Sequence, residues 1–324
     1  MITASDVKRM ARQLGADLVG IASAAELNAN PPDPLWPQTP ARLLEECTSV
    51  IAIAKRIPWG LLRSHDSLLH RMAPILTIDP IERIAVELSY WLEDQGFHAV
   101  PAPGEIADIR LKGGSYGLLS LRHVAVEAGL GTIGLNMLLL TPEYGPRVYL
   151  AAVMTNAELE WDGVRKESLC LGPSCGRCLL TCPGDAVLHW GLDKRKCVPY
   201  AQPAGPHKLL RHIENLLAAE DKEEQRKLAL GPQTIDIYQS TWYAMGAVGA
   251  CPKCISVCPI GEDYKLHLRD MYRKVPGADD AKRARLAALR LAEQEGRGET
   301  SLSHSRRWVG SLRATSQGTE ELNS

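Results

Sequence analysis

Eight cysteines in the second half of this 324-residue chain restrict its fold more than any other feature. They fall into two runs, over 170–182 and 197–258, and each run ends in Cys-x2-Cys-x3-Cys-Pro. Closely spaced cysteines followed by proline are typical ligands of four-iron clusters, in which inorganic sulfide bridges the irons and thiolates anchor them. The chain is therefore expected to fold around two 4Fe–4S clusters.

The order of the cysteines predicts how they divide between the clusters. In two-cluster modules of the bacterial ferredoxin type, the cysteine before proline binds the cluster that its close neighbours do not bind. The predicted ligands are Cys170, Cys175, Cys178 and Cys258 for one cluster, and Cys182, Cys197, Cys251 and Cys254 for the other. Cys170 lies further from Cys175 than the usual spacing, so a cluster with fewer irons at that end is an alternative.

Zinc sites and disulfide bonds are the other common uses of clustered cysteines. Zinc ribbons favour two Cys-x2-Cys pairs without the trailing proline, and disulfides need an oxidising compartment. The N-terminal sequence has no apolar segment after a basic start and no twin-arginine pair, so we expect a cytoplasmic protein with reduced thiols. Cys47 stands alone beside an apolar stretch and is expected to be a small core residue.

Composition narrows the classes of partner. The net charge is -1, which does not favour binding to nucleic acid or to an anionic membrane. No apolar run reaches the roughly 18 residues that a membrane-spanning helix needs. The hydrophobic fraction of 45% is enough for a sizeable core.

Hydrophobic periodicity predicts an α/β (α+β) core. We expect helices over 4–16, 81–96 and 119–130, strands over 16–23, 49–57 and 147–156, and a loop over 59–80. The expected domains are a core of residues 1–164, a cysteine module of 165–275 with a helical insert at 207–230, and a partly mobile C-terminal tail of 276–324.

Three glycines form a second informative motif. Gly129, Gly131 and Gly134 match G-x-G-x-x-G, the pattern of dinucleotide-binding folds. Here they follow a predicted helix and precede a strand, which is the reverse of the order in those folds. Because glycine permits close approach to the backbone, the motif instead indicates a flat or bulky ligand.

At these residues the chain resembles a known superfamily. AGLG-x-x-G-x-N, then LLL-TPEYGPRV, then the paired cysteine module with WGLDKRKC before Cys197, is similar to the cobalamin-dependent reductases. That superfamily contains the respiratory reductive dehalogenases and the tRNA-modifying epoxyqueuosine reductases. The resemblance spans residue 4 to about residue 265. It implies a nitroreductase-like core that binds cobalamin base-off, with the double 4Fe–4S module closing over the corrin.

The resemblance also implies which residues contact cobalamin. Backbone amides and small side chains of two segments would contact the corrin and its nucleotide tail. These residues are Ala128, Gly129, Leu130, Gly131, Gly134, Asn136, Thr141, Pro142, Glu143, Tyr144 and Gly145.

The chain departs from epoxyqueuosine reductases at the proton donor. Their acidic donor corresponds to Ser115 here, and the adjacent Tyr116 is the candidate catalytic acid, by analogy with the tyrosine donor of dehalogenases. Arg110 and Arg147 are candidate contacts for an anionic substrate, although arginines at such positions are more often solvated or paired.

By this resemblance the chain is an oxidoreductase. An external donor, ferredoxin or flavodoxin, would supply electrons through the two clusters for reductive cleavage of a carbon–halogen or carbon–oxygen bond in a small molecule. Epoxyqueuosine reduction, corrinoid-dependent demethylation and simple 4Fe–4S electron transfer are the alternatives. tRNA is not the expected partner, because helical repeats that would hold it are absent and the charge is not basic.

Overall fold

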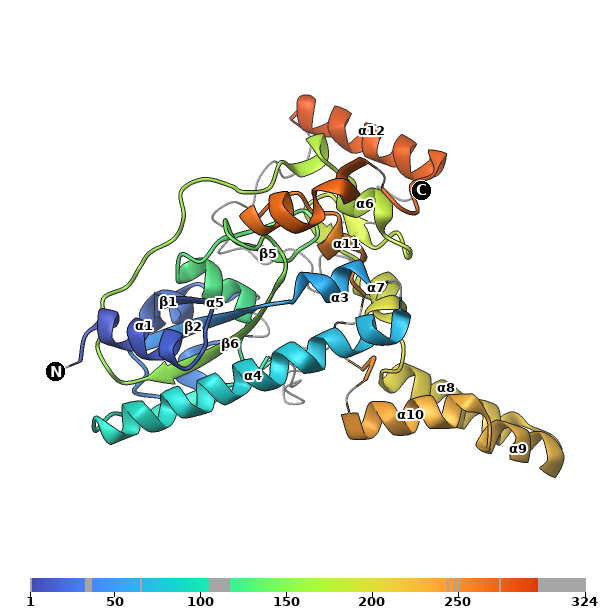
Figure 1. The fold of residues 1–324 in the computed structure, drawn as a ribbon, viewed down its shortest axis with the longest axis horizontal. Coiled ribbons are helices and arrows are strands. Elements are labelled where there is room, and N and C mark those ends of the chain that lie inside the picture. Colours follow the sequence, from blue (N-terminus) through green and yellow to red (C-terminus); the bar gives the residue numbers. More distant parts are fainter. Residues whose placement is uncertain are drawn as a thin grey trace.

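The computed structural model describes residues 2–32, 37–64, 66–104, 117–243, 245–247, 249, 251–273 and 275–296. At its centre is a four-stranded sheet in the order β1-β2-β6-β3, in which every neighbouring pair is antiparallel (Figure 1). The strands are β1 Leu18–Ser23, β2 Ser49–Arg56, β3 Ala99–Ala102 and β6 Val148–Thr155. The mixed helical and strand composition confirms the predicted fold class.

Helices cover both faces of this sheet. α1 (Ala4–Gln13) and α4 (Ser67–Asp94) pack on the face that carries Ile51, while α5 (Leu121–Glu127) packs on the face that carries Ala52. A strand buried on both faces is apolar throughout instead of alternating with polar residues. The run SVIAIA in β2 is apolar for this reason.

The predicted first helix is confirmed, and its start has a clear local cause. Thr3 is the N-cap residue, and its hydroxyl oxygen accepts a hydrogen bond of 3.2 Å from the Asp6 amide. The Asp6 carboxylate in turn accepts a hydrogen bond of 3.1 Å from the Thr3 amide. This reciprocal capping satisfies two of the amides that a helix start leaves without partners.

The expected loop over 59–80 is wrong, because this segment is largely helical. α3 spans Trp59–Arg63, and α4 begins at Ser67 and continues through Pro74 and Pro80. A proline inside a helix costs roughly 3 kcal/mol. Here the C-terminal half of the helix, from Ile81 to Leu92, buries an apolar face against the sheet, so tertiary packing outweighs that cost.

The remaining elements belong mostly to the cysteine-rich half, which lies at one end of the sheet (Figure 1). The helices are α2 Ala24–Ala29, α6 Arg177–Thr181, α7 Lys194–Ala201, α11 Lys253–Ser256 and α12 Asp280–Gln294, with short turns at Pro40–Arg42, Gly172–Ser174, Tyr264–Leu268 and Arg269–Arg273. Two small hairpins pair β4 Thr132–Ile133 with β5 Leu139–Leu140, and β7 Val187–Leu188 with β8 Gly191–Leu192.

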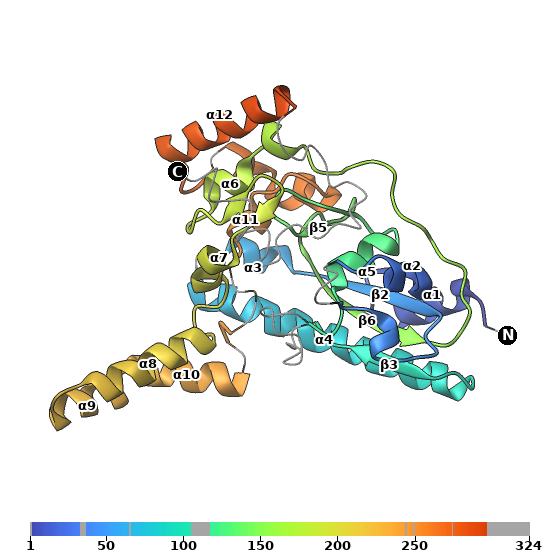
Figure 2. The same ribbon diagram turned by 180° about the vertical axis from the view of Figure 1, so that it is seen from behind.

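The predicted helical insert is longer than expected. It comprises α8 (Pro206–Ala218), α9 (Lys222–Ala229) and α10 (Pro232–Tyr243), and it projects away from the body of the molecule in both views (Figures 1 and 2). None of the helices in the described ranges is both long and apolar enough to cross a bilayer.

Candidate functional site

The eight clustered cysteines gather in two places. One small cavity is lined by Cys170, Cys175, Cys178 and Cys258. A larger cavity of about 400 Å³ is lined by Cys182, Cys197, Cys251 and Cys254. This grouping coincides with the predicted division between two clusters, and we name the sets the outer group and the inner group, respectively. Their role as cluster ligands stays a prediction.

The described residues contain no group of three or more His, Cys, Asp or Glu side chains positioned around a single metal ion. The four thiolates of a four-iron cluster each bind a different iron atom, so cluster ligands do not converge on one point. What a cluster requires is four soft sulfur donors around a shared space, and each group provides them.

Burial controls the protonation of these thiols. It raises the pKa of Cys258 to about 12 and that of Cys197 to about 11, and it raises the pKa of Cys178 and Cys254 further. The neighbouring cysteines in each group add to the effect, because several thiolates close together repel one another. A cationic iron core would offset both costs, so metal binding at these groups releases protons.

Several hydrogen bonds point at the sulfur atoms. Cys170 Sγ accepts from the amides of Leu135 at 3.3 Å and Gly172 at 3.4 Å, and Cys182 Sγ accepts from the Ala186 amide at 3.3 Å. Such bonds orient ligands and tune the potential of a cluster. Cys170, whose spacing was unusual, is thus held among the outer group.

Arg147 connects the sheet to the cysteine module. Its side chain is fully buried, and it forms a bidentate ion pair with Asp263 at 2.6 and 2.8 Å. Its remaining donors reach the carbonyl oxygens of Cys258 at 3.0 Å and Ile260 at 2.6 Å. The guanidinium therefore fixes the segment that carries the last cysteine of the outer group. It is a paired arginine, and it is not among the described residues that line the larger cavity.

The turn at 141–145 belongs to the same contact between core and cysteine module, which we call the joint. The carbonyl oxygens of Pro142 and Glu143 accept hydrogen bonds of 3.1 Å from the amides of Glu262 and Asp263. Gly145 has a φ of +52°, and a Cβ there would lie 2.0 Å from the carbonyl oxygen of Ile260. In this structure the turn predicted to contact corrin contacts the cysteine module.

Replacing Gly145 by alanine should lower the free energy of unfolding by about 2–3 kcal/mol, because the new methyl group collides with backbone and the φ is unfavourable. Gly163 is a matched control: its φ is +76°, and nothing lies within 4 Å of its Cβ position. Gly163→Ala measures the φ cost alone. Chemical denaturation of both variants checks the prediction, and equal losses would show that the contact with Ile260 is not tight.

The glycine-rich segment is also packed against the protein itself. A Cβ at Gly131 would lie 1.9 Å from the Leu140 carbonyl oxygen, and one at Gly134 would lie 2.9 Å from the Leu140 side chain. Both glycines therefore allow the β4–β5 hairpin to close. Ala128, Gly129 and Leu130 line a separate open pocket with residues 162–165.

Asn136 is the exception among the predicted cobalamin contacts. It lines both the inner and the outer cavity, so it lies between the two cysteine groups. Its side-chain amide lies near Cys254, and this polar neighbour favours the thiolate and partly opposes the rise in pKa that burial causes. The amide oxygen accepts from the Leu138 amide at 3.3 Å. The other ten positions do not line the larger cavity.

Replacing Asn136 by leucine should lower the reduction potential of an inner-group cluster by about 20–60 mV, because one hydrogen bond to a sulfur stabilises the more negative, reduced form by about 0.5–1.5 kcal/mol. Gln38→Leu is the control: Gln38 lines the same cavity but donates to the Gly117 carbonyl oxygen. An EPR-monitored redox titration measures both. An unchanged or higher potential in the Asn136 variant would contradict the prediction.

Core and module contribute together to the wall of the larger cavity. Apolar side chains from the core, including Leu119 and Val148, face others from the module, including Val187 and Ile255. Polar groups are few, as is usual for sites that hold a bulky, mostly apolar molecule with polar edges. A corrinoid fits this kind of lining. Tyr116 lies outside the described residues.

Three cations line this cavity, and the sequence patterns did not single them out. They are Arg122, Lys194 and Lys253, and no described lining residue is acidic. Burial, followed by repulsion from Arg122, lowers the pKa of Lys194 to about 8. A basic run such as DKRKC is usually solvated, so only the fold reveals that Lys194 faces a cavity.

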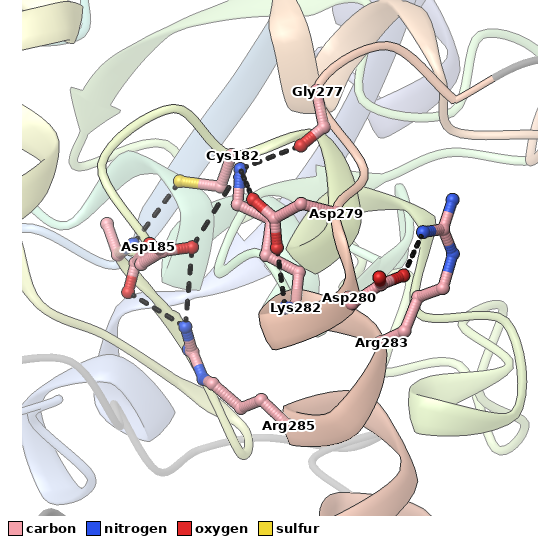
Figure 3. Close-up of polar contacts among 9 residues, drawn as sticks. Cys182, Asp185, Gly277, Asp279, Asp280, Lys282, Arg283 and Arg285 are labelled. Carbon is pink, nitrogen blue, oxygen red and sulfur yellow. Dashed lines mark hydrogen bonds and ion pairs between the residues drawn. The ribbon is translucent and has the colours of Figure 1, made fainter.

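Helix α12 secures the loop after Cys182 (Figure 3). Lys282 donates to the Gly277 carbonyl oxygen at 3.0 Å, and Arg285 lies 3.7 Å from the Asp185 carboxylate. Arg285 also donates to the Val187 carbonyl oxygen. The expected C-terminal tail therefore starts with a helix that holds the cysteine module, and residues 297–324 lie outside the described part of the chain.

No model of a known protein family matches the chain. The epoxyqueuosine reductase of Bacillus subtilis is 32% identical over 154 residues, which cover 47% of this chain and 32% of the relative. The tetrachloroethene reductive dehalogenase of Dehalobacter restrictus is 26% identical over 231 residues, covering 56% of this chain and 38% of the relative. The chain thus matches only about a third of the length of these two relatives. The epoxyqueuosine reductase of Gloeobacter violaceus is 28% identical over 286 residues, covering 79% of this chain and 76% of the relative.

Solved structures of both kinds share the fold. The structure of epoxyqueuosine reductase from Bacillus subtilis superposes with a TM-score of 0.50 at 22% identity, covering 85% of this chain and 68% of the other. A catabolic reductive dehalogenase superposes with a TM-score of 0.52 at 15% identity, covering 94% of this chain and 37% of the other. The chain is therefore similar in sequence to both epoxyqueuosine reductases and reductive dehalogenases, and it shares its fold with solved structures of both kinds.

Proposed function

We propose that the chain is a cobalamin- and iron–sulfur-dependent oxidoreductase that reductively cleaves a carbon–halogen or carbon–oxygen bond in a small molecule. The observation that carries this proposal is the division of eight cysteines into two groups of four, one of which lines the cavity between core and module. The cytoplasm, where thiols stay reduced, suits such groups. A structural relative at a TM-score of 0.50 is described as a reductive dehalogenase with B12-dependent dehalogenation.

When bound, two 4Fe–4S clusters supply low-potential electrons and base-off cobalamin supplies the cobalt chemistry. In this proposal residues 165–275 would hold the clusters, and the corrinoid would occupy the larger cavity between residues 1–164 and the module, where Asn136 is the predicted contact that lines the wall.

The chain's own residues order the path of electrons. The outer group shares its small cavity with Leu171, which is 62% exposed, and we propose this side as the docking site of a ferredoxin or flavodoxin. Asn136 lies between the outer and inner groups, and the inner group faces the larger cavity. With both clusters bound, the outer one would be on the side of the donor and the inner one on the side of the substrate.

Charge and protons at the cavity come from a few side chains. Arg122, Lys194 and Lys253 oppose the negative charge of four inner thiolates and of any anionic substrate. The apolar walls exclude water, which strengthens these interactions. Tyr116 is the proposed proton donor.

Anaerobic purification with cobalamin supplied tests the proposal. Iron, sulfide and corrin are measured together with the EPR spectrum, and the expected result is about eight irons per chain, from two four-iron clusters, with one base-off corrinoid. Clusters without corrin would refute the reductase and leave an electron carrier. Zinc in place of iron would refute the clusters as well.

Epoxyqueuosine reduction is the second candidate, and the length of the match to the Gloeobacter violaceus relative favours it. The loaded protein would be given an epoxyqueuosine-containing tRNA stem loop and, separately, a panel of organohalides, with a reduced flavodoxin. Conversion of the RNA alone selects epoxyqueuosine reduction, and halide release alone selects dehalogenation. The near-neutral charge of the chain predicts weak, salt-insensitive RNA binding.

A further inference from the structure

The insert formed by α8, α9 and α10 exposes an unusual number of large apolar side chains. Nine of the twenty exposed large hydrophobic residues in the described chain lie within 206–243. Six of them form what we call the insert face: Leu209, Ile213 and Leu217 on α8, and Ile235, Tyr238 and Trp242 on α10. A soluble protein rarely leaves such a patch open to water without a binding partner.

Helix geometry places these six side chains on one side of the insert. His212 on α8 and Thr234 on α10 hydrogen-bond at 3.1 Å, so they mark the sides on which the helices face each other. Successive residues of a helix are rotated by roughly 100° about its axis. Measured from His212, the three apolar residues of α8 are rotated by about 60–140°, and measured from Thr234, those of α10 are rotated by about 40–100° in the same sense. The two helices are antiparallel, as the chain path in both views shows (Figures 1 and 2). When two antiparallel helices face each other, residues rotated by similar angles from the contact lie on the same side of the pair. The six apolar side chains therefore form one surface.

We propose that the insert face is a dimerisation surface, occupied by the same face of a second copy of this chain. The insert carries five Lys or Arg residues and six Asp or Glu residues over 206–243. tRNA or an acidic redox protein would be attracted by a strongly basic surface, which the insert lacks. A nearly neutral apolar surface does not repel its own copy.

The size of the face matches this occupant. From their exposed fractions of 41–81%, the six residues present on the order of 700 Å², of which the two aromatic residues contribute somewhat less than half. That is about the area that each partner of a standard protein interface buries. Tyr238 and Trp242, whose ring centroids are 6.2 Å apart, are the residue types that most often dominate binding energy.

The insert is held in a fixed position on the body. Asp236 on α10 lies 3.3 Å from Arg71 of α4 and 3.6 Å from Lys208 of α8, and the Ser240 hydroxyl donates to the Ala204 carbonyl oxygen at 2.6 Å. The insert projects away from the body of the molecule, so its helices lie clear of the sheet (Figure 2). Each face then meets its identical counterpart in a closed pair.

Light scattering coupled to size-exclusion chromatography tests the proposal on the full-length, cluster-loaded protein at tens of micromolar. The expected mass is twice the 35.5 kDa of one chain. Tyr238→Glu combined with Trp242→Glu should weaken the dimer at least ~100-fold, since aromatic hot-spot side chains carry most of the binding energy of an interface. Both side chains are exposed, so circular dichroism and iron content should stay unchanged.

The matched control is Leu76→Glu combined with Tyr90→Glu. These residues are also exposed apolar side chains, at 50% and 59%, but they lie on α4. This variant should remain dimeric. A monomeric wild-type protein would overturn the proposal, and so would a dimer that survives the Tyr238 and Trp242 substitutions. If the wild-type protein is a monomer and the Tyr238 and Trp242 substitutions abolish its binding to tRNA or to flavodoxin, the insert face binds that partner instead.

Discussion

Replacing Arg147 by methionine is expected to lower the free energy of unfolding by about 3–5 kcal/mol, as observed when one partner of a buried ion pair is removed. Asp263 would keep its charge without its bidentate partner, and the carbonyl oxygens of Cys258 and Ile260 would lose their donors. Because the same segment carries Cys258, iron bound at the outer group should be lost with it. Chemical denaturation and iron analysis of the purified variant measure the two effects.

Two further variants identify the cause. Arg147→Lys keeps the charge but not the planar set of donors, so it should recover only part of the loss. Arg56→Met removes an exposed arginine whose ion pair with Asp17 spans 3.6 Å, and such surface pairs contribute at most about 1 kcal/mol. If the Arg147 and Arg56 variants were equally stable, the joint between core and module would not depend on this side chain.

Removing one cysteine from each group should have the largest effect on the cofactors. Cys178→Ser is expected to abolish the outer cluster and Cys254→Ser the inner one, so each variant should keep about four of about eight irons. The two variants should differ in the EPR signal that remains. Reductive activity should fall to background in both, because electrons need the complete path.

Cys47→Ser is the matched control for these variants. Cys47 is a half-buried thiol outside both groups, its partial burial raises its pKa to about 11, and it donates to the Ser49 carbonyl oxygen at 3.4 Å. Its replacement should leave the iron content unchanged. Loss of all iron from either Cys178→Ser or Cys254→Ser would show that the two groups do not bind separate clusters.

The sequence predicted best what local chemistry determines. The cysteine order depends on iron chemistry, and the structure gathers these residues in the predicted sets. The apolar strand expected over 49–57 depends on local burial, and the helix expected at the start of the chain depends on local hydrogen bonding. Both elements are present. The loop expected over 59–80 is helical although the segment contains Pro74 and Pro80, because tertiary packing outweighs their local preference against helix.

Contacts between residues that are far apart in the chain could not be predicted from the sequence. Nothing local marks Asp263 as the partner of Arg147, since 116 positions separate them. The glycines at 131 and 145 were predicted to accommodate a ligand, yet the structure shows close contacts with Leu140 and Ile260. A glycine in a sequence indicates that another group approaches the backbone closely, but it does not show whether that group is a ligand or the protein itself.

The joint at Arg147 also constrains the order of events during synthesis. Strands β1, β2, β3 and β6 are complete once residue 155 has been made, but the acceptors for the Arg147 guanidinium come from residues 255–263. A growing chain that ends before Asp263 must leave this arginine solvated, since burying it alone would cost several kcal/mol. The contact between core and module can therefore form only after residue 263 has been made, five residues after Cys258 completes the outer group.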